Sequence, residues 1–156
     1  LNEVLIKNPK VDKIEIYGDT KLLKNDGKNF QNISFQGHIP REKVKEILSN
    51  NKRIFFLLEL NPPCPNSLIE AISVGLPCIG FDTGSFKELL GGAGKSIFYN
   101  ANVWKLEIPD FSYINQEVEE IIDKYESYKQ TSLKVSKKYK LEKMLNDYFQ
   151  IINSMV

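Results

Sequence analysis

Two apolar runs separated by one short helical pattern constrain the fold of this chain more than any other feature. Arg53–Leu60 (RIFFLLEL) and Pro77–Phe81 (PCIGF) are nearly continuous apolar runs, which is typical of strands buried on both faces of a sheet. Between them, Ser67–Val74 has helical apolar spacing, and Gly75 and Pro77 supply the usual stop signals. This order predicts parallel strands joined by a crossover helix.

The rest of the chain repeats this alternation. Strands are also predicted at Lys13–Tyr17, Ile33–Gln36 and Ser96–Tyr99, a loop at Gly91–Gly94, and helices at Leu1–Lys7, Arg41–Ser49, Ser85–Leu89, Gln116–Tyr128 and Leu133–Met155. We therefore expect an α/β fold, a Rossmann-like open parallel sheet with helices on both faces, and one domain over residues 1–156 whose C-terminal helices span about 116–155. In such folds, ligands bind at the carboxyl ends of the strands.

Composition excludes several classes of protein. The 21 lysine and arginine residues are balanced by 20 aspartate and glutamate residues, which argues against a nucleic-acid partner. No apolar run reaches the roughly 18 residues that a membrane span needs. Cys64, Cys78 and the single histidine, His38, lack metal-ligand spacing, so no metal is expected. So few cysteines fit a reducing, cytoplasmic location.

The start of the Ser67–Val74 helix allows two interpretations. Ser67 and Glu70 fit the capping-box pattern, in which the serine hydroxyl and the glutamate each satisfy a backbone N–H of the first turn. The alternative is that free amides near Asn66, Ser67 and Leu68 hold a phosphate, because a helix start carries partial positive charge. The Glu70 carboxylate would repel phosphate but would accept two hydrogen bonds from a ribose diol.

The segment Asn61–Glu88 resembles the signature of the C-terminal, donor-binding domain of family-4 retaining glycosyltransferases, which have the GT-B fold. The shared pattern is Glu-Ala-x-x-x-Gly-x-Pro at Glu70–Pro77, an apolar strand, and a small polar turn at Asp82–Glu88. Upstream, Ile33–Ile39 resembles the family's strand with a Gly-x-aliphatic turn, and Ile16–Gly18 the strand and glycine before it. The resemblance covers Ile14 to about Tyr99 and implies an N-terminally truncated half of a GT-B fold.

The resemblance implies a role for each matched position. Glu70 would bind the ribose of a nucleotide-sugar donor, and the amides of Asn66, Ser67 and Leu68 its diphosphate. The turn formed by Gly37, His38 and Ile39 would lie against the base, with His38 as an exposed turn residue and not a catalytic one. The implied function is that of the donor domain of a hexosyltransferase. It would bind a nucleoside-diphosphate sugar for retaining transfer of a hexose to a saccharide or lipid-linked acceptor, as in polysaccharide biosynthesis. The nucleotide sugar is a substrate, so no cofactor is expected.

Two departures from the family pattern matter. Pro62 stands eight residues before Glu70, where the family carries an acid that contacts the donor sugar, and Asn61 is the candidate to replace it. The family's basic pair, which neutralises the leaving diphosphate, precedes the position of Leu1, as do its first strand and its acceptor-binding domain. The sequence is therefore expected to be a fragment that is inactive alone. The alternative function is a non-catalytic, glycosyltransferase-like binding or scaffolding module. A receiver-type signalling domain is disfavoured, because the long strand ends in Asn-Pro-Pro and not in acids.

The C-terminal tail carries an apolar stripe with helical spacing. Its residues are Leu141, Met144, Leu145, Tyr148, Phe149 and Ile152. We expect this stripe to pack on the domain's own sheet, with a second domain as the alternative partner. Lysines 134, 137, 138 and 140 predict at most a weak association with the inner face of an anionic membrane.

Overall fold

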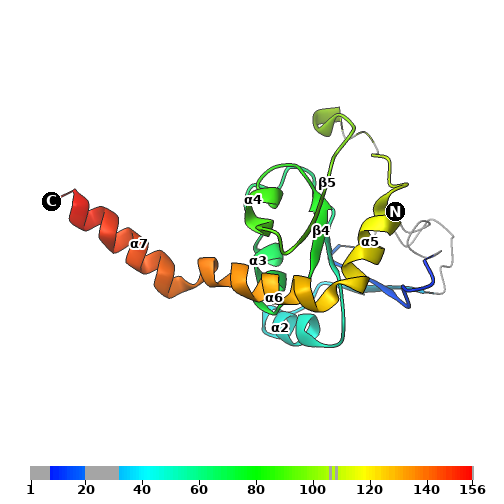
Figure 1. The fold of residues 1–156 in the computed structure, drawn as a ribbon, viewed down its shortest axis with the longest axis horizontal. Coiled ribbons are helices and arrows are strands. Elements are labelled where there is room, and N and C mark those ends of the chain that lie inside the picture. The colour runs from blue at the N-terminus through cyan, green and yellow to red at the C-terminus, as the bar shows by residue number, and fades with distance from the viewer. Residues whose placement is uncertain (1–7, 20–31, 106, 108, 156) are drawn as a thin grey trace.

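The strands of the structure are all parallel in their pairings and form two sheets (Figure 1). The computed structural model describes residues 8–19, 32–105, 107 and 109–155, which leaves the predicted helix at Leu1–Lys7 outside the described residues. The described strands are β1 (Ile14–Tyr17), β2 (Ile33–Gly37), β3 (Phe55–Leu57), β4 (Cys78–Phe81) and β5 (Gly94–Ile97). One sheet has the order β1-β2 and the other β3-β4-β5, and every pairing is parallel.

The two sheets are linked through side chains. Within the described residues, β1 and β3 form no ladder with each other. Instead, the Arg53 guanidinium donates a hydrogen bond of 2.7 Å to the Glu15 carboxylate. Hydrogen bonds from Lys13 and Tyr17, together with the charge of Arg53, lower the pKa of Glu15.

The three-stranded sheet is covered on both faces, as predicted. On one face, β4 contributes Cys78 to a core with α3 (Asn66–Ser73), α4 (Phe86–Leu90) and α6 (Tyr125–Ser136). On the other face, Ile79 and Phe81 pack against α5 (Ile114–Asp123), which lies across the sheet from α3 and α4 (Figure 1). These layers confirm the predicted α/β fold with helices on both faces.

Two strand predictions need correction. The strand predicted at Arg53–Leu60 is only Phe55–Leu57, and the side chain of Leu58 is 41% exposed. Both faces of β3 pack against core, with Phe55 and Leu57 on one side and Phe56 on the other, as predicted. Phe55 and Phe56 are only half-buried, and among the described strands β3 pairs with β4 alone. The last strand is Gly94–Ile97 and not Ser96–Tyr99. Gly94 lies in register with Cys78, so close that a Cβ on Gly94 would stand 1.8 Å from the Cys78 carbonyl oxygen.

The helices follow the predictions less closely toward the C-terminus. The predicted helix at Arg41–Ser49 is confirmed as α2, and α4 is shifted by one residue. The helix predicted at Gln116–Tyr128 is interrupted at Lys124, where α5 ends and α6 begins. The predicted Leu133–Met155 helix comprises the end of α6, the 3₁₀ turn η3 (Lys137–Tyr139) and α7 (Leu141–Ser154). A further 3₁₀ turn, η2, spans Val103–Lys105.

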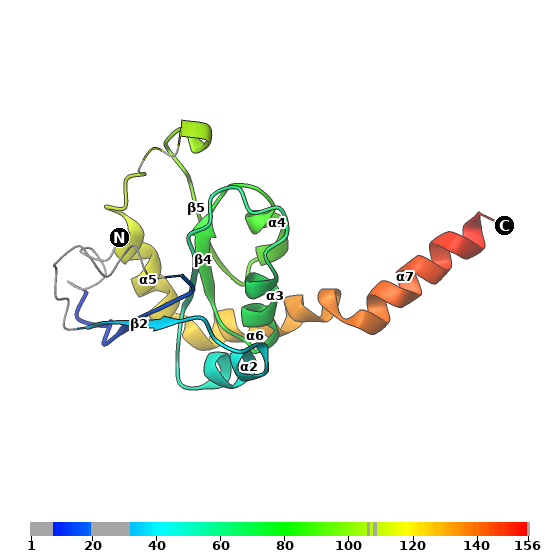
Figure 2. The same ribbon diagram turned by 180° about the vertical axis from the view of Figure 1, so that it is seen from behind.

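Helix α7 extends away from the sheets as an arm (Figures 1 and 2). Every residue from 141 to 155 is exposed. The expectation that the apolar stripe packs on the domain's own sheet is therefore wrong: η3 and the extended backbone at Lys140 direct α7 away from the core. No helix among the described residues is long and apolar enough to cross a membrane.

Candidate functional site

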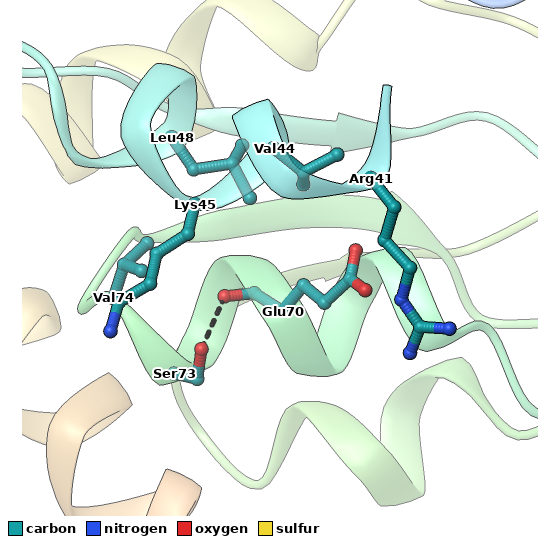
Figure 3. Close-up of a pocket in the computed structure, with 7 residues that line it drawn as sticks. All are labelled: Arg41, Val44, Lys45, Leu48, Glu70, Ser73 and Val74. Atoms are coloured by element: carbon teal, nitrogen blue, oxygen red, sulfur yellow. Dashed lines mark hydrogen bonds between the residues drawn. The ribbon is translucent and has the colours of Figure 1, made fainter. Parts of the chain in front are cut away.

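Helices α2 and α3 lie side by side and enclose a small pocket between them (Figure 3). Its volume is about 180 Å³. The lining side chains are those of Arg41, Val44, Lys45, Leu48, Glu70, Ser73 and Val74. Val44, Leu48 and Val74 are apolar, whereas Arg41 and Glu70 carry opposite charges. The pocket brings together a residue that the sequence predicts as functional, Glu70, and one that it does not, Arg41.

Helix α3 begins one residue earlier than predicted and without a side-chain cap. Pro65 is the N-cap residue, and no side chain caps the helix, so the capping box of Ser67 and Glu70 is wrong. Ser67 lies inside the first turn and is exposed. Proline can occupy the cap because its φ of −75° suits the turn into the helix, but it offers no side-chain acceptor.

The absence of a cap leaves amides at this helix start available. The N–H of Leu68 donates to the carbonyl oxygen of Pro65 at 3.1 Å. The N–H groups of Asn66 and Ser67 have no hydrogen-bond acceptor among the described residues, and no helix residue precedes them to provide one. Asn66 and Ser67 are both exposed, so their N–H groups can donate hydrogen bonds to an anionic ligand from solvent.

Glu70 follows one turn later on α3. It is half-buried, and Figure 3 shows its side chain extending between the two helices toward the end at which Arg41 lies. Its backbone carbonyl accepts a hydrogen bond of 2.7 Å from the Ser73 hydroxyl. In the described part of the chain, the Glu70 carboxylate has neither a hydrogen bond nor an ion pair. A half-buried carboxylate without a partner is suited to accept hydrogen bonds from a ligand.

The loop before α3 is fastened to the turn after β4. The N–H of Asn61 donates to the Thr83 hydroxyl at 3.2 Å, and the carbonyl oxygen of Pro62 accepts from the N–H and hydroxyl of Ser85. Gly84, with φ of +57°, lies between these contacts, and a Cβ on it would stand 2.3 Å from the Pro62 oxygen. The turn predicted as part of the family signature therefore holds the loop in place.

Pro62 and Asn61 point to different environments. The Pro62 ring is less than 2% exposed, so the position where the family carries an acid is buried in this chain. Asn61 is exposed and adopts a left-handed conformation with φ of +55°, which asparagine tolerates better than most residues. Of the two, only Asn61 presents a polar side chain to solvent.

The turn at Gly37, His38 and Ile39 leads from β2 directly into α2. Gly37 has φ of +71°, and its carbonyl oxygen accepts a hydrogen bond of 2.9 Å from the N–H of Gly18. His38 is exposed, as expected for a turn residue. The turn connects to the pocket through Arg41, the first residue of α2. The signal that could have indicated Arg41 is its place after Pro40, at the start of a helix that follows the predicted base-binding turn.

Comparison with known proteins places this geometry in a family. The family model of glycosyl transferases group 1 matches residues 15–138, which is most of the chain. No curated protein matches the sequence. One similar solved structure is that of the pneumococcal O-GlcNAc transferase GtfA in complex with UDP and GlcNAc. It has 19% identity and a TM-score of 0.70, and the match covers 91% of this chain and 29% of that one.

A second similar structure is that of the GtfA/B complex, with 21% identity and a TM-score of 0.71. This chain again covers 29% of the matched chain, so it spans less than a third of the length of these proteins. At such identities the solved structures show a shared fold. The family model goes further, because its match includes the two sheets, the pocket and most of the helices. The chain belongs to the glycosyl transferases group 1 family.

Proposed function

We propose that this chain is the donor-nucleotide domain of a retaining, family-4 hexosyltransferase. The observation that carries the proposal is the Glu70 carboxylate, which has no partner among the described residues and lies one turn after two unbonded amides at the start of α3. The amides of Asn66 and Ser67, with the partial positive charge of the helix start, suit a diphosphate. Glu70 suits the ribose hydroxyls. The N–H of Leu68, which was expected to contact the diphosphate as well, already donates to the carbonyl oxygen of Pro65. Gly37, His38 and Ile39 would lie against the base.

In this proposal the domain positions a nucleoside-diphosphate sugar for transfer to a saccharide or lipid-linked acceptor. The bond between the sugar C1 and the diphosphate oxygen breaks, and its electron pair stays on the diphosphate. The acceptor hydroxyl oxygen bonds to C1 on the same face, and its proton passes to the departing diphosphate oxygen. The amides at the start of α3 would stabilise the charge that develops on the diphosphate, and this is the main service such a site can offer.

The comparisons support the proposal at a coarser level. The family is one of glycosyl transferases, and the similar structure of GtfA contains UDP and GlcNAc. The proposal for this chain is more specific, because it assigns the nucleotide to the start of α3 and the ribose to Glu70.

Calorimetric titration of the protein with UDP, GDP and ADP tests the proposal. At least one of these nucleotides is expected to bind, and Glu70→Ala is expected to weaken that binding at least about tenfold, since charged hydrogen bonds contribute about 1.5–3 kcal/mol. The matched control is Glu46→Ala, which removes an exposed carboxylate of α2 that does not line the pocket. Absence of binding by all three nucleotides, or equal binding by the Glu70 variant, would contradict the proposal.

The second candidate function is a non-catalytic, glycosyltransferase-like module. The buried Pro62 favours it, because Pro62 stands where the family carries its sugar-contacting acid and offers the donor sugar no polar side chain. The measurement that separates the two candidates is release of free nucleotide from UDP, GDP and ADP sugars by the full-length protein. Nucleotide binding without any turnover favours the module, and turnover favours the enzyme.

Three further expectations belong to the same proposal. No metal is required, so EDTA should leave nucleotide affinity unchanged. An N-terminal acceptor domain completes the enzyme. The protein acts in the cytoplasm, with weak attachment to the inner membrane face through the exposed lysines 134, 137, 138 and 140. Sedimentation with anionic vesicles at low and at physiological salt tests this attachment, since salt screens it.

A further inference from the structure

The side chain of Arg41 reaches the pocket from α2, whereas that of Glu70 reaches it from α3. Arg41 is the first residue of α2, and Pro40 before it has extended backbone, with ψ of 138°. Figure 3 shows the Arg41 side chain descending from α2 toward α3, at the same end of the pocket as the Glu70 carboxylate. Both residues line the same space of about 180 Å³.

Arg41 has no ion-pair or hydrogen-bond partner within the described residues. The chain's other arginine, Arg53, differs, because it pairs with Glu15 at 2.7 Å. Arg41 and Glu70 thus present opposite charges to one opening without bonding to each other. A ligand that satisfies both must offer hydrogen-bond donors to the carboxylate and acceptors to the guanidinium.

A nucleoside has this combination of groups. Its ribose hydroxyls donate, and the carbonyl oxygens of its base accept. A phosphate at Arg41 is disfavoured because it would also face the Glu70 carboxylate, whereas the amides of Asn66 and Ser67 offer an anion site one turn away. Val44 and Leu48 line the space with apolar surface against which a flat ring can lie.

The size of the pocket agrees with this assignment. Pockets that enclose a whole ligand are usually about 300–1000 Å³. A space of about 180 Å³ therefore suits one end of a nucleotide, while the diphosphate lies over the start of α3.

We propose that Arg41 determines which base is accepted, by donating a hydrogen bond to a carbonyl oxygen of the base. This inference rests on the proposed nucleotide function of the same site and extends it. A guanidinium only donates hydrogen bonds, so it favours uracil and guanine, which carry carbonyl oxygens. Adenine carries an amino group, a hydrogen-bond donor, where guanine has its carbonyl, so adenine offers Arg41 only ring nitrogens and is selected against. The expected donor is therefore a uridine or guanosine diphosphate sugar.

The test compares nucleotides and variants by calorimetry. Wild-type protein is titrated with UDP, GDP, ADP and inorganic pyrophosphate, and so are Arg41→Gln, Arg41→Lys and the control Lys43→Gln. Lys43 is exposed on the same helix and does not line the pocket, so its variant makes the same change of net charge. Circular dichroism confirms that each variant is folded, as expected for exposed positions.

The expected result is selective. Arg41→Gln should weaken binding of UDP or GDP about tenfold or more, as for one lost charged hydrogen bond, and leave ADP and pyrophosphate unchanged. The affinity of Arg41→Lys for UDP or GDP should fall between those of wild type and Arg41→Gln, because lysine keeps the charge but lacks the planar guanidinium. Lys43→Gln should resemble wild type.

Four outcomes would overturn the inference. Equal weakening of all nucleotides and of pyrophosphate by Arg41→Gln would make Arg41 a phosphate contact. Unchanged binding of UDP and GDP, with wild-type protein binding them, would remove Arg41 from the site and leave the proposed function intact. Wild-type protein that prefers ADP would contradict the base assignment, whereas wild-type protein that binds no nucleotide would overturn the proposed function as well.

Discussion

The carbonyl oxygen of Pro62 accepts two hydrogen bonds from Ser85, one from the backbone N–H at 2.9 Å and one from the hydroxyl at 3.1 Å. These bonds join the loop that enters α3 to the turn that leaves β4. The Pro62 carbonyl would otherwise be a buried acceptor without a partner, and the start of α3 would lose its support. The position of the unbonded amides of Asn66 and Ser67 thus depends on a turn some twenty residues away in the sequence.

The same contact predicts an unusual sensitivity at Gly84. Gly84→Ala places a Cβ 2.3 Å from the Pro62 oxygen in a backbone with φ of +57°. We expect a loss of about 1 kcal/mol of stability for the left-handed alanine and about 1–3 kcal/mol more for the clash. Chemical denaturation followed by fluorescence or circular dichroism measures this loss.

The matched control for this change is Gly92→Ala. Gly92 also has positive φ, +89°, but a Cβ there would meet only the Thr131 methyl group at 3.8 Å. This variant should show the backbone cost alone, about 1 kcal/mol. Equal losses for Gly84→Ala and Gly92→Ala would mean that the loop moves freely away from the turn.

The fold was predictable where local signals and burial agree. The run at Pro77–Phe81 became β4, all four of whose strand residues are buried, and Gly75 ended α3 with φ of +85°. The run at Arg53–Leu60 has an equally apolar sequence, but its length as a strand depends on the neighbouring strands, which local sequence does not specify. The orientation of α7 likewise depends on contacts with other parts of the structure, which the local sequence does not specify.

The candidate site was predictable in part, for similar reasons. The family motif identified Glu70. Its position relative to the helix start follows from local structure, because a helix fixes where a residue four positions after its start lies. The capping role of Ser67 was wrong because Pro65 starts the helix, and nothing local separates a helix that begins at Asn66 from one that begins at Ser67. Arg41 was missed because its place in the pocket depends on how α2 packs against α3, and Arg41 and Glu70 are nearly thirty residues apart in the sequence.

Removing α7 should leave the stability of the rest of the chain unchanged. Every residue from 141 to 155 is exposed, so a chain ending at Lys140 loses no buried core contact. We expect the same thermal midpoint by circular dichroism for both chains, and less self-association of the shorter one in light scattering, because large apolar side chains such as Phe149, 61% exposed, are gone.

A change in α6 provides the contrast. Val135 is buried in the core beneath α3 and α4, and Val135→Ala should cost about 1–3 kcal/mol. A midpoint that falls as far on removal of α7 as in the Val135 variant would show that α7 supports the fold.

The charge cluster around Lys95 predicts a specific dependence of stability on pH. Lys95, on β5, lies 3.1 Å from the Glu117 carboxylate and donates a hydrogen bond to Glu120. Burial alone would lower the pKa of Lys95, but the hydrogen bond to Glu120 and the neighbouring carboxylate of Glu117 outweigh it and raise that pKa. Hydrogen bonds from Lys95 and then Lys124 lower the pKa of Glu120 to about 2.

A carboxyl group whose pKa is lower in the folded than in the unfolded state stabilises the fold above its unfolded pKa, and this contribution is lost as pH falls toward the folded value. Lys95→Met should therefore reduce stability at pH 7, and the difference from wild type should shrink between about pH 4.5 and pH 2. Urea denaturation of both proteins at several pH values measures this difference in stability. Lys143→Met, which breaks an exposed pair with Asp147 on α7, should have little effect at any pH, and a constant Lys95 difference would contradict the pairing.

The side chain of Asn61 should distinguish the sugar from the nucleotide in donor binding. Asn61 is exposed beside the buried Pro62, and its left-handed φ of +55° allows Asn61→Gly to remove the side chain without backbone strain. If the Asn61 amide contacts the donor sugar, this variant should bind the free nucleoside diphosphate as wild type does. It should bind the corresponding nucleotide sugar several-fold more weakly, as for one hydrogen bond of about 0.5–1.5 kcal/mol. Calorimetry with both ligands measures the two affinities on the same protein. Equal weakening of both would instead indicate that Asn61 shapes the loop before α3, and equal affinity for both would remove it from the site.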